Sequence, residues 1–303
     1  MHEWSLLIYT LLMQLCVGVY LVQEILRYTV SKGKHITEIN MICNRLLVFI
    51  GMIAVFATFV SFFHLGNPFK AYNALNNLRS SWLSREILFQ LAFLLGVAVV
   101  IAIRPTKIFP DWLKKGVSIF TGLLGIVLIF TMAKLYMLTT IPVWNNLTTP
   151  VSFFITTFLL GGFTFLSGMM LLKKSILKDS PNLLERFNLF FQKSIKMISL
   201  FSILFLGLEI LMFPVLIQLL RTNLSVEGNI IGGMSMNQLF PMILRFILIL
   251  SAIVSIGIVY HKPKQSRVTS INSRLPYMIF LIILCSEILG RFVFYASCSQ
   301  IGI

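Results

Sequence analysis

Apolar runs of roughly 20 residues recur along the whole chain of 303 residues. An α-helix needs a run of about this length to cross the hydrocarbon core of a bilayer. Only helices and closed barrels satisfy their backbone polar groups in lipid, so we expect each run to be a membrane-spanning helix. The eight predicted spans cover about 5–26, 44–63, 86–103, 117–138, 151–172, 194–220, 242–260 and 277–297.

The composition agrees with an all-α integral membrane protein. Hydrophobic residues make up 57% of the chain and charged residues 12%, against about 45–50% and about 25% in a soluble domain. No segment is long and polar enough for a separate soluble domain, so 1–303 is predicted to be one polytopic domain, arranged as two four-helix bundles. No internal repeat is apparent in the residues. Four prolines are expected in connections between spans: Pro105, Pro150, Pro241 and Pro276.

The first apolar run is expected to be retained as a span. It begins after Glu3 instead of a basic stretch, and no small-residue cleavage site follows it, which is unlike a signal peptide.

The lysines and arginines predict the orientation of the spans. Of the 25 in the chain, 18 lie in or beside the connections that follow spans 1, 3, 5 and 7, and 4 lie in those that follow spans 2, 4 and 6. Because basic residues concentrate in cytoplasmic loops, both termini and the 65–85 loop are predicted to be periplasmic, in a bacterial cytoplasmic (inner) membrane. The net charge of +15 follows from these loops and does not indicate nucleic-acid binding.

Histidine and cysteine positions argue against metal redox centres in this protein. A buried b-type haem needs axial ligands inside the bilayer, and none of the histidines lies in the middle of a span: His2, His35, His64 and His261. The four cysteines show no C-x-x-C or cluster spacing, so we expect no iron–sulfur cluster and no structural metal. No nucleotide-binding or nucleophile motif is present either.

Ionisable residues inside spans are costly in lipid and usually face the protein interior or a water cavity. The sequence has seven candidates: Glu24, Glu86, Lys134, Glu209, Arg245, Glu287 and Arg291. In the predicted orientation, all except Glu24 fall in the middle or the outer half of the membrane.

Three of these groups have more than one interpretation. Glu287 and Arg291 are four residues apart and share a helix face, so they form either a structural ion pair or the wall of a ligand cavity. Arg245 could pair with Glu209 across helices, and Lys134 could extend its amine to the outer interface. Whether Glu209 and Glu287 serve a proton path or only the structure stays open.

Four segments of the sequence resemble one known family. They are "HEW" at His2–Trp4, "HLGNPFKAYNALNNLRSSWLSREI" at His64–Ile87, "KLYMLTTIPVWNNLTTP" at Lys134–Pro150 and "SEILGRFVFY" at Ser286–Tyr295. The family is the membrane anchor subunit of bacterial dimethyl sulfoxide reductase, related to the haem-free anchors of the polysulfide reductase type. The similarity runs in order from the first residue to the last span.

The resemblance implies a function that the composition does not. Such anchors bind menaquinol, oxidise it, and pass electrons to an iron–sulfur subunit. They hold this subunit and a molybdopterin catalytic subunit at the outer face of the cytoplasmic membrane. In the family, the histidine of the H-L-G segment and the glutamate of the S-x-E segment are tied to quinol binding; here they are His64 and Glu86. Further candidate quinol contacts are Tyr72, Lys134, Arg245, Glu287 and Arg291. Lys134 departs from the family, where we expect arginine.

The residue chemistry is compatible with that function. A quinol releases two protons with its two electrons, so its site needs a hydrogen-bond acceptor and a base that works near neutral pH. An imidazole such as His64 at a water-facing helix end fits the base, although an interface histidine that caps span 2 is the plain alternative. The buried charges also fit a proton-coupled transporter, which would show broken helices and internal repeats. A haem-free anchor for another S- or N-oxide, polysulfide or tetrathionate is equally compatible.

Overall fold

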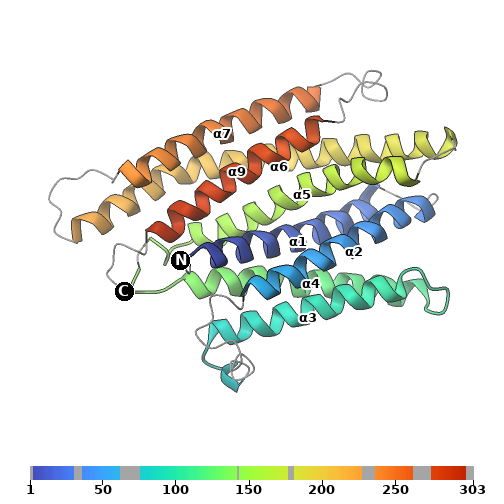
Figure 1. Ribbon diagram of the computed structural model, residues 1–303, viewed down its shortest axis with the longest axis horizontal. Helices are drawn as coiled ribbons and strands as arrows, with labels where there is room; N and C mark the ends of the chain where they lie inside the picture. Colours follow the sequence, from blue (N-terminus) through green and yellow to red (C-terminus); the bar gives the residue numbers. More distant parts are fainter. Residues whose placement is uncertain are drawn as a thin grey trace.

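Eight long helices make up the described part of the protein, which is known from a computed structural model (Figure 1). The structure describes residues 3–30, 36–61, 76–141, 143–176, 181–226, 236–261 and 274–297. Each helix is long and apolar enough to cross a membrane, and no strand is present in these ranges. The helices are α1 (Glu3–Val30), α2 (Ile36–Ser61), α3 (Trp82–Ile103), α4 (Asp111–Tyr136), α5 (Thr148–Ile176), α6 (Pro181–Val226), α7 (Met236–His261) and α9 (Leu275–Ala296).

The helices form two four-helix bundles, as predicted. In the first, α1 packs on α2, α2 on α3, α3 on α4, and α4 returns to α1. The second repeats this order with α5, α6, α7 and α9. In Figure 1 the second bundle lies above the first, and the start of α1 and the end of α9 lie at the same left-hand end. The two halves therefore share one packing order although their residues show no evident repeat.

The two bundles meet along α1 and α5, which make the most extensive helix contact in the molecule. Most of α1 is buried, including Met13, Val17 and Tyr20, which are fully inaccessible. By contrast, α6, α7 and α9 expose large apolar side chains such as Leu211, Val254 and Leu281. Exposed apolar side chains on long helices are expected where lipid is the solvent, so α1 is the central helix and the outer helices face the bilayer.

Proline positions correct the sequence analysis in part. Pro105 does lie in a connection. Pro150 and Pro276 lie in the first turns of α5 and α9, where the missing N–H has no helical acceptor to lose. Pro241 lies inside α7, and Pro214, which was not singled out, lies inside α6. The apolar pattern alone does not reveal such interior prolines because membrane helices tolerate them.

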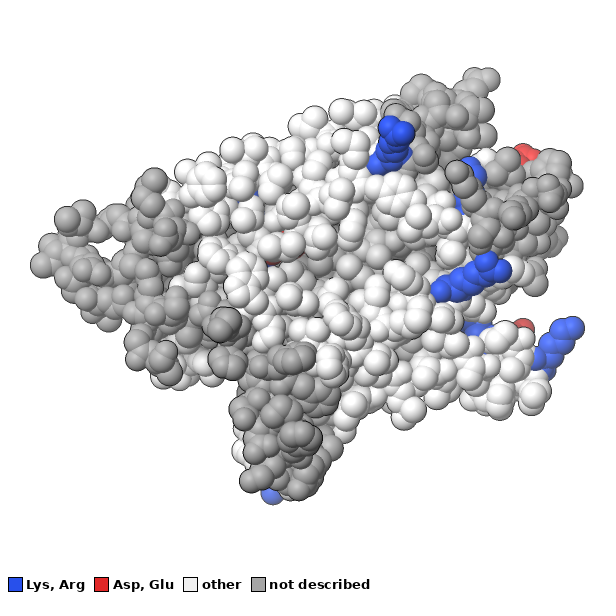
Figure 2. All heavy atoms as spheres, in the orientation of Figure 1, with Lys and Arg blue, Asp and Glu red and all other residues white. Residues whose placement is uncertain are grey.

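Basic side chains gather at one end of the molecule (Figure 2). That end contains the last turn of α1 with Arg27, the C-cap of α3 at Arg104, and the start of α4 with Lys114 and Lys115. It is opposite the end at which α1 starts and α9 ends in Figure 1. We call it the basic end, and the other the terminal end.

Candidate functional site

Glu86 lies one helical turn inside α3, near the terminal end. The sequence analysis expected span 3 to begin at this residue, but α3 begins at Trp82 because Ser81 caps it: its hydroxyl accepts a hydrogen bond from the Ser84 amide at 3.3 Å. The preceding Arg85 turns away and donates to the Leu78 carbonyl at 2.9 Å, with its guanidinium over the Trp82 ring. Glu86 therefore faces the bundle interior, while the cation of the neighbouring Arg85 points elsewhere.

Glu86 is held by side chains from two other helices. Its Oε1 lies 2.8 Å from the phenol oxygen of Tyr9 on α1, and the same phenol oxygen lies 2.8 Å from Oε1 of Gln90. The amide nitrogen of Gln90 donates to the Thr58 hydroxyl of α2 at 2.7 Å, and that hydroxyl donates to the Ala54 carbonyl at 2.9 Å. We call Glu86, Tyr9, Gln90 and Thr58 the Glu86 network.

The second carboxyl oxygen of Glu86 differs from the first. Glu86 is only 4% exposed, yet its Oε2 has no hydrogen-bond partner among the residues that the structure describes. A buried oxygen of this kind costs free energy unless a ligand, a proton or water meets it. One carboxyl oxygen of Glu86 is therefore held by a hydrogen bond, and the other is available to a ligand, a proton or water.

An aromatic cluster adjoins the Glu86 network at the terminal end. Tyr136 of α4 contacts Trp144, Phe153 and Tyr295 with ring centroids 5.5–5.7 Å apart, and Trp144 stacks on Phe294. The Tyr295 hydroxyl lies 3.2 Å from the Thr10 hydroxyl and 3.1 Å from the Tyr136 hydroxyl. These rings pack against one another where the two bundles meet.

A second buried polar group lies in the C-terminal bundle. One guanidinium nitrogen of Arg245 lies 2.9 Å from Glu209 and 3.9 Å from Glu287. Thr156 of α5 donates to the other oxygen of Glu287 at 2.7 Å. The predicted pair of Arg245 with Glu209 is confirmed.

Arg291 is oriented differently from the prediction. Its contact is with Gln14 of α1, whose amide oxygen it approaches at 3.2 Å, and its guanidinium lies 3.6 Å from the centre of the Phe153 ring. No ion pair within 4.0 Å joins it to Glu287 in the described ranges, because Glu287 faces Arg245 and Thr156 instead. Helical spacing alone could not show these partners on other helices.

The C-terminal group lines a small cavity. Glu209, Arg245, Glu287 and Arg291 share it with Ser152 and Thr156, and its volume is about 60 Å³. That volume suits one or two water molecules and is far too small for a quinol ring. Three polar atoms of the lining residues have no hydrogen-bond partner among the described residues, namely Glu209 Oε2, Glu287 Oε1 and Arg245 Nε. Glu86 is not among the lining residues, so the structure separates Glu86 from the four charged residues of the second bundle.

Other predicted site residues lie elsewhere. Lys134 is half-buried in the last turn of α4. His64 and Tyr72 lie outside the described residues. Within the described ranges, no three histidine, cysteine or acidic side chains come close enough to hold a metal ion.

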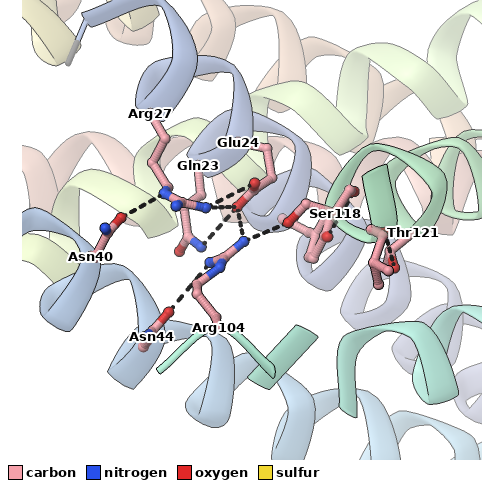
Figure 3. A network of polar contacts seen from close by, with 10 residues as sticks. Gln23, Glu24, Arg27, Asn40, Asn44, Arg104, Ser118 and Thr121 are labelled. Atoms are coloured by element: carbon pink, nitrogen blue, oxygen red, sulfur yellow. Dashed lines mark hydrogen bonds and ion pairs between the residues drawn. The ribbon is translucent and has the colours of Figure 1, made fainter. Parts of the chain in front are cut away.

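Glu24, a buried acid at the basic end, joins the first four helices (Figure 3). Its carboxylate accepts from Arg27 at 3.0 Å and from Arg104 at 2.7 Å. Arg104 also donates to Ser118 of α4 at 2.7 Å, and Arg27 to Asn40 of α2 at 3.0 Å. Every charge in this group has a partner, so its role is structural.

Comparison with known proteins identifies the family. A family profile described as DMSO reductase anchor subunit (DmsC) matches residues 1–297. The chain belongs to this family. Together with its eight apolar helices, this makes it a multi-pass protein of the inner membrane.

Individual DMSO reductase proteins match parts of the sequence. The C subunit of the anaerobic dimethyl sulfoxide reductase of Haemophilus influenzae is 31% identical over 179 residues, which cover 57% of this protein. The YnfH subunit of the anaerobic dimethyl sulfoxide reductase of Escherichia coli is 33% identical over 167 residues, or 53% of this protein. The match spans 61% and 55% of the lengths of these two relatives.

The sequence analysis missed Tyr9, Gln90 and Thr58. All three are uncharged, and each stands alone in an apolar run. One signal was present: Gln90 follows Glu86 by four residues, so both lie on one face of α3. No sequence signal indicates that Tyr9 of α1 meets that face.

Proposed function

We propose that this anchor subunit binds menaquinol at the terminal end of the first bundle and oxidises it with the help of Glu86 and His64. The observation that carries the proposal is the Glu86 carboxyl, which is buried inside a membrane helix with one oxygen anchored and one without a described partner. An ionisable group in this setting is a functional candidate by default. Membership of the DMSO reductase anchor family supports the same assignment.

The proposed chemistry is a two-electron, two-proton oxidation. Menaquinol loses both hydroxyl protons and two electrons and becomes menaquinone. Glu86 accepts one proton at its open oxygen, and the imidazole of His64 accepts the other hydroxyl proton as a general base. Tyr72 belongs to the same polar segment as His64 and is a further candidate contact. Arg245, Glu287 and Arg291 line a cavity too small for the ring, so we leave them out of the quinol site, as we do Lys134.

The electrons leave through partner subunits in this proposal. The anchor itself holds no haem and no iron–sulfur cluster, so electrons pass to an iron–sulfur subunit and then to a molybdopterin catalytic subunit. Both partners dock at the periplasmic face, which is the terminal end. The basic end of the structure, opposite the start of α1 and the end of α9, supports this orientation because basic residues favour the cytoplasmic side.

Dimethyl sulfoxide is the proposed final acceptor because the matched relatives are named as parts of dimethyl sulfoxide reductases. Acceptor choice resides in the catalytic subunit, so another S- or N-oxide, polysulfide or tetrathionate would use the same anchor chemistry. A proton-coupled transporter is the remaining alternative. Its one structural support is the buried acid pair around Arg245.

The test compares two electron donors in membranes that contain the complete enzyme. Glu86→Gln and His64→Ala should abolish turnover with menaquinol and leave turnover with a dye that reduces the partner subunits directly. Glu24→Gln is the matched control, because that carboxyl is also buried in the first bundle but lies at the basic end. Normal menaquinol oxidation and normal quinol-analogue affinity in both site variants would overturn the proposal.

A further inference from the structure

The phenol of Tyr9 faces two acceptors with one proton. Its oxygen lies 2.8 Å from the Glu86 carboxyl oxygen and 2.8 Å from the Gln90 amide oxygen. A phenol donates one hydrogen bond, so it cannot serve both oxygens at once. The amide oxygen cannot bear a proton, whereas the carboxyl oxygen can. The observed arrangement is therefore complete only when Glu86 is protonated and donates to Tyr9.

The far end of the Glu86 network fits this protonated state. Tyr9 then donates to Gln90, the Gln90 amide nitrogen donates to Thr58, and Thr58 donates to the Ala54 carbonyl. Every hydroxyl and carboxyl proton in the network has one acceptor, and all donors point from Glu86 towards α2. The direction of the hydrogen bonds is thus tied to the proton on Glu86.

A half-turn of one amide reverses the whole network. The oxygen and nitrogen of a glutamine amide have nearly the same shape and exchange places by rotation about the last side-chain bond. With Gln90 turned, Thr58 donates to the amide oxygen, the amide nitrogen donates to Tyr9, and Tyr9 donates to Glu86. The carboxylate now receives a donor and bears no proton. Ala54 loses only a second hydrogen bond, because its carbonyl already belongs to the α2 helix.

We propose that Tyr9, Gln90 and Thr58 form a reversible hydrogen-bond relay that lets Glu86 take up and release a proton without leaving a polar atom of the relay unpaired. The inference rests on the proposed function of Glu86 in quinol oxidation. A buried unpaired donor or acceptor destabilises the protein, and the relay avoids one in both protonation states.

The proton balance is simple. The open oxygen of Glu86 receives one quinol proton, and rotation of the carboxyl presents that proton to Tyr9. The Tyr9 hydroxyl rotates so that it donates to Gln90 instead of Glu86. The Gln90 amide turns, and the Thr58 hydroxyl rotates so that it donates to the Ala54 carbonyl. No proton enters or leaves the relay beyond the one on Glu86, and release of that proton runs the same steps in reverse. Tyr9, Gln90 and Thr58 are therefore positioning residues.

Among the residues that the structure describes, few other titratable groups lie near Glu86. Tyr9 comes from α1, Tyr136 from α4 and Tyr295 from α9. The described part of α2 contributes Thr58, which does not titrate, and Arg85 of α3 is directed to the Leu78 carbonyl. Because the proposed site also includes His64, only a pH effect that changes in Tyr9→Phe or Thr58→Val is assigned to Glu86 and the relay.

Three substitutions interrupt the relay at successive links: Tyr9→Phe, Gln90→Met and Thr58→Val. In membranes with the complete enzyme, each should lower kcat for menaquinol roughly tenfold or more, with little change in KM. Complete loss of proton transfer costs about 10²–10⁴-fold. The acidic limb of the pH–rate profile should move to higher pH in Tyr9→Phe, because ionised Glu86 loses its donor. Thr58→Ser, which keeps the hydroxyl, should restore the wild-type profile.

Tyr20→Phe is the matched control. Tyr20 is also on α1 and fully buried, and its phenol donates to the Ser118 carbonyl at 2.9 Å, away from the Glu86 network. This variant should keep the wild-type kcat and pH profile. Dye-dependent turnover normalises every variant for assembled enzyme, and Thr58→Val decides the matter if Tyr9→Phe does not assemble, since valine has nearly the shape of threonine.

A direct observation is also possible. Infrared difference spectra between acidic and alkaline samples, with ¹³C-labelled glutamine side chains, should show an amide band that shifts together with a carboxyl band. Both should be absent in Glu86→Gln. A wild-type kcat and pH profile in Thr58→Val would overturn the relay while the loss of turnover in Glu86→Gln leaves the proposed function intact. Full turnover in Glu86→Gln would instead overturn the proposed function.

Discussion

Gly18 of α1 and Gly161 of α5 lie backbone against backbone at the junction of the two bundles. A Cβ on Gly161 would stand 2.5 Å from Cα of Gly18, and a Cβ on Gly18 would stand 2.9 Å from Cα of Gly161. Lipid provides no hydrophobic driving force between helices, so close packing of small residues is a main source of helix association. This contact fixes α1 against α5, next to the aromatic cluster in which Thr10 of α1 meets Tyr295 at 3.2 Å.

Gly161→Ala should therefore destabilise the protein more than an ordinary methyl addition. Overpacking costs about 1–3 kcal/mol where side chains can adjust, and here the obstacle is backbone. We expect a lower thermal midpoint in detergent and less of the protein in membranes. Gly207→Ala on α6 is the control, because a Cβ there meets nothing within 4 Å. Equal midpoints for the two variants would contradict the close contact.

The membrane orientation gives a second prediction. Reporter fusions at Lys32, Lys115, Lys178 and Lys264 should all behave as cytoplasmic, because the basic residues concentrate in these connections and, where described, at the basic end. A fusion at the C-terminus should behave as periplasmic. Periplasmic signals at two or more of the four lysines would contradict the orientation, and with it the docking face proposed for the partners.

The helix number followed from the sequence for a physical reason. A span must bury about 20 apolar residues, and this requirement leaves a long and unmistakable pattern. The ends of the helices were harder to predict from the sequence. The polar residues Thr37 and Glu38 do not fit an apolar run, so the first turns of α2 were not predicted. The cap at Ser81 makes α3 one turn longer than the predicted span.

The candidate site was predictable only in part. Glu86 was found because a carboxylate inside an apolar run is conspicuous, and its importance came from the family resemblance. Tyr9 was missed because tyrosine is unremarkable in a membrane helix and its partner lies 77 residues away in the sequence. The same limit explains Arg291, for which helical spacing suggested Glu287 while the fold supplies Gln14. Partners within one helix follow from spacing, whereas partners across helices require the packing.

Arg245 gives the third prediction, which concerns the second buried group. Its guanidinium contacts Glu209 at 2.9 Å and Glu287 at 3.9 Å, and both acids are at most 3% exposed. Arg245→Leu removes the guanidinium that both buried acids contact. Loss of one partner from a buried ion pair typically costs about 3–5 kcal/mol of stability. We expect a large fall in the thermal midpoint, measured in detergent. Lys134→Met is the control, with little change expected for a half-buried residue at a helix end.

The double variant Arg245→Leu with Glu209→Leu separates structure from function at this group. Replacing both members of a buried ion pair by apolar residues is often neutral or stabilising, so the midpoint should recover much of the loss. Menaquinol turnover per assembled enzyme should then be near normal, because the cavity is too small for the quinol ring. A stable double variant that cannot oxidise menaquinol would contradict this structural role and would return Arg245 and Glu209 to the reaction.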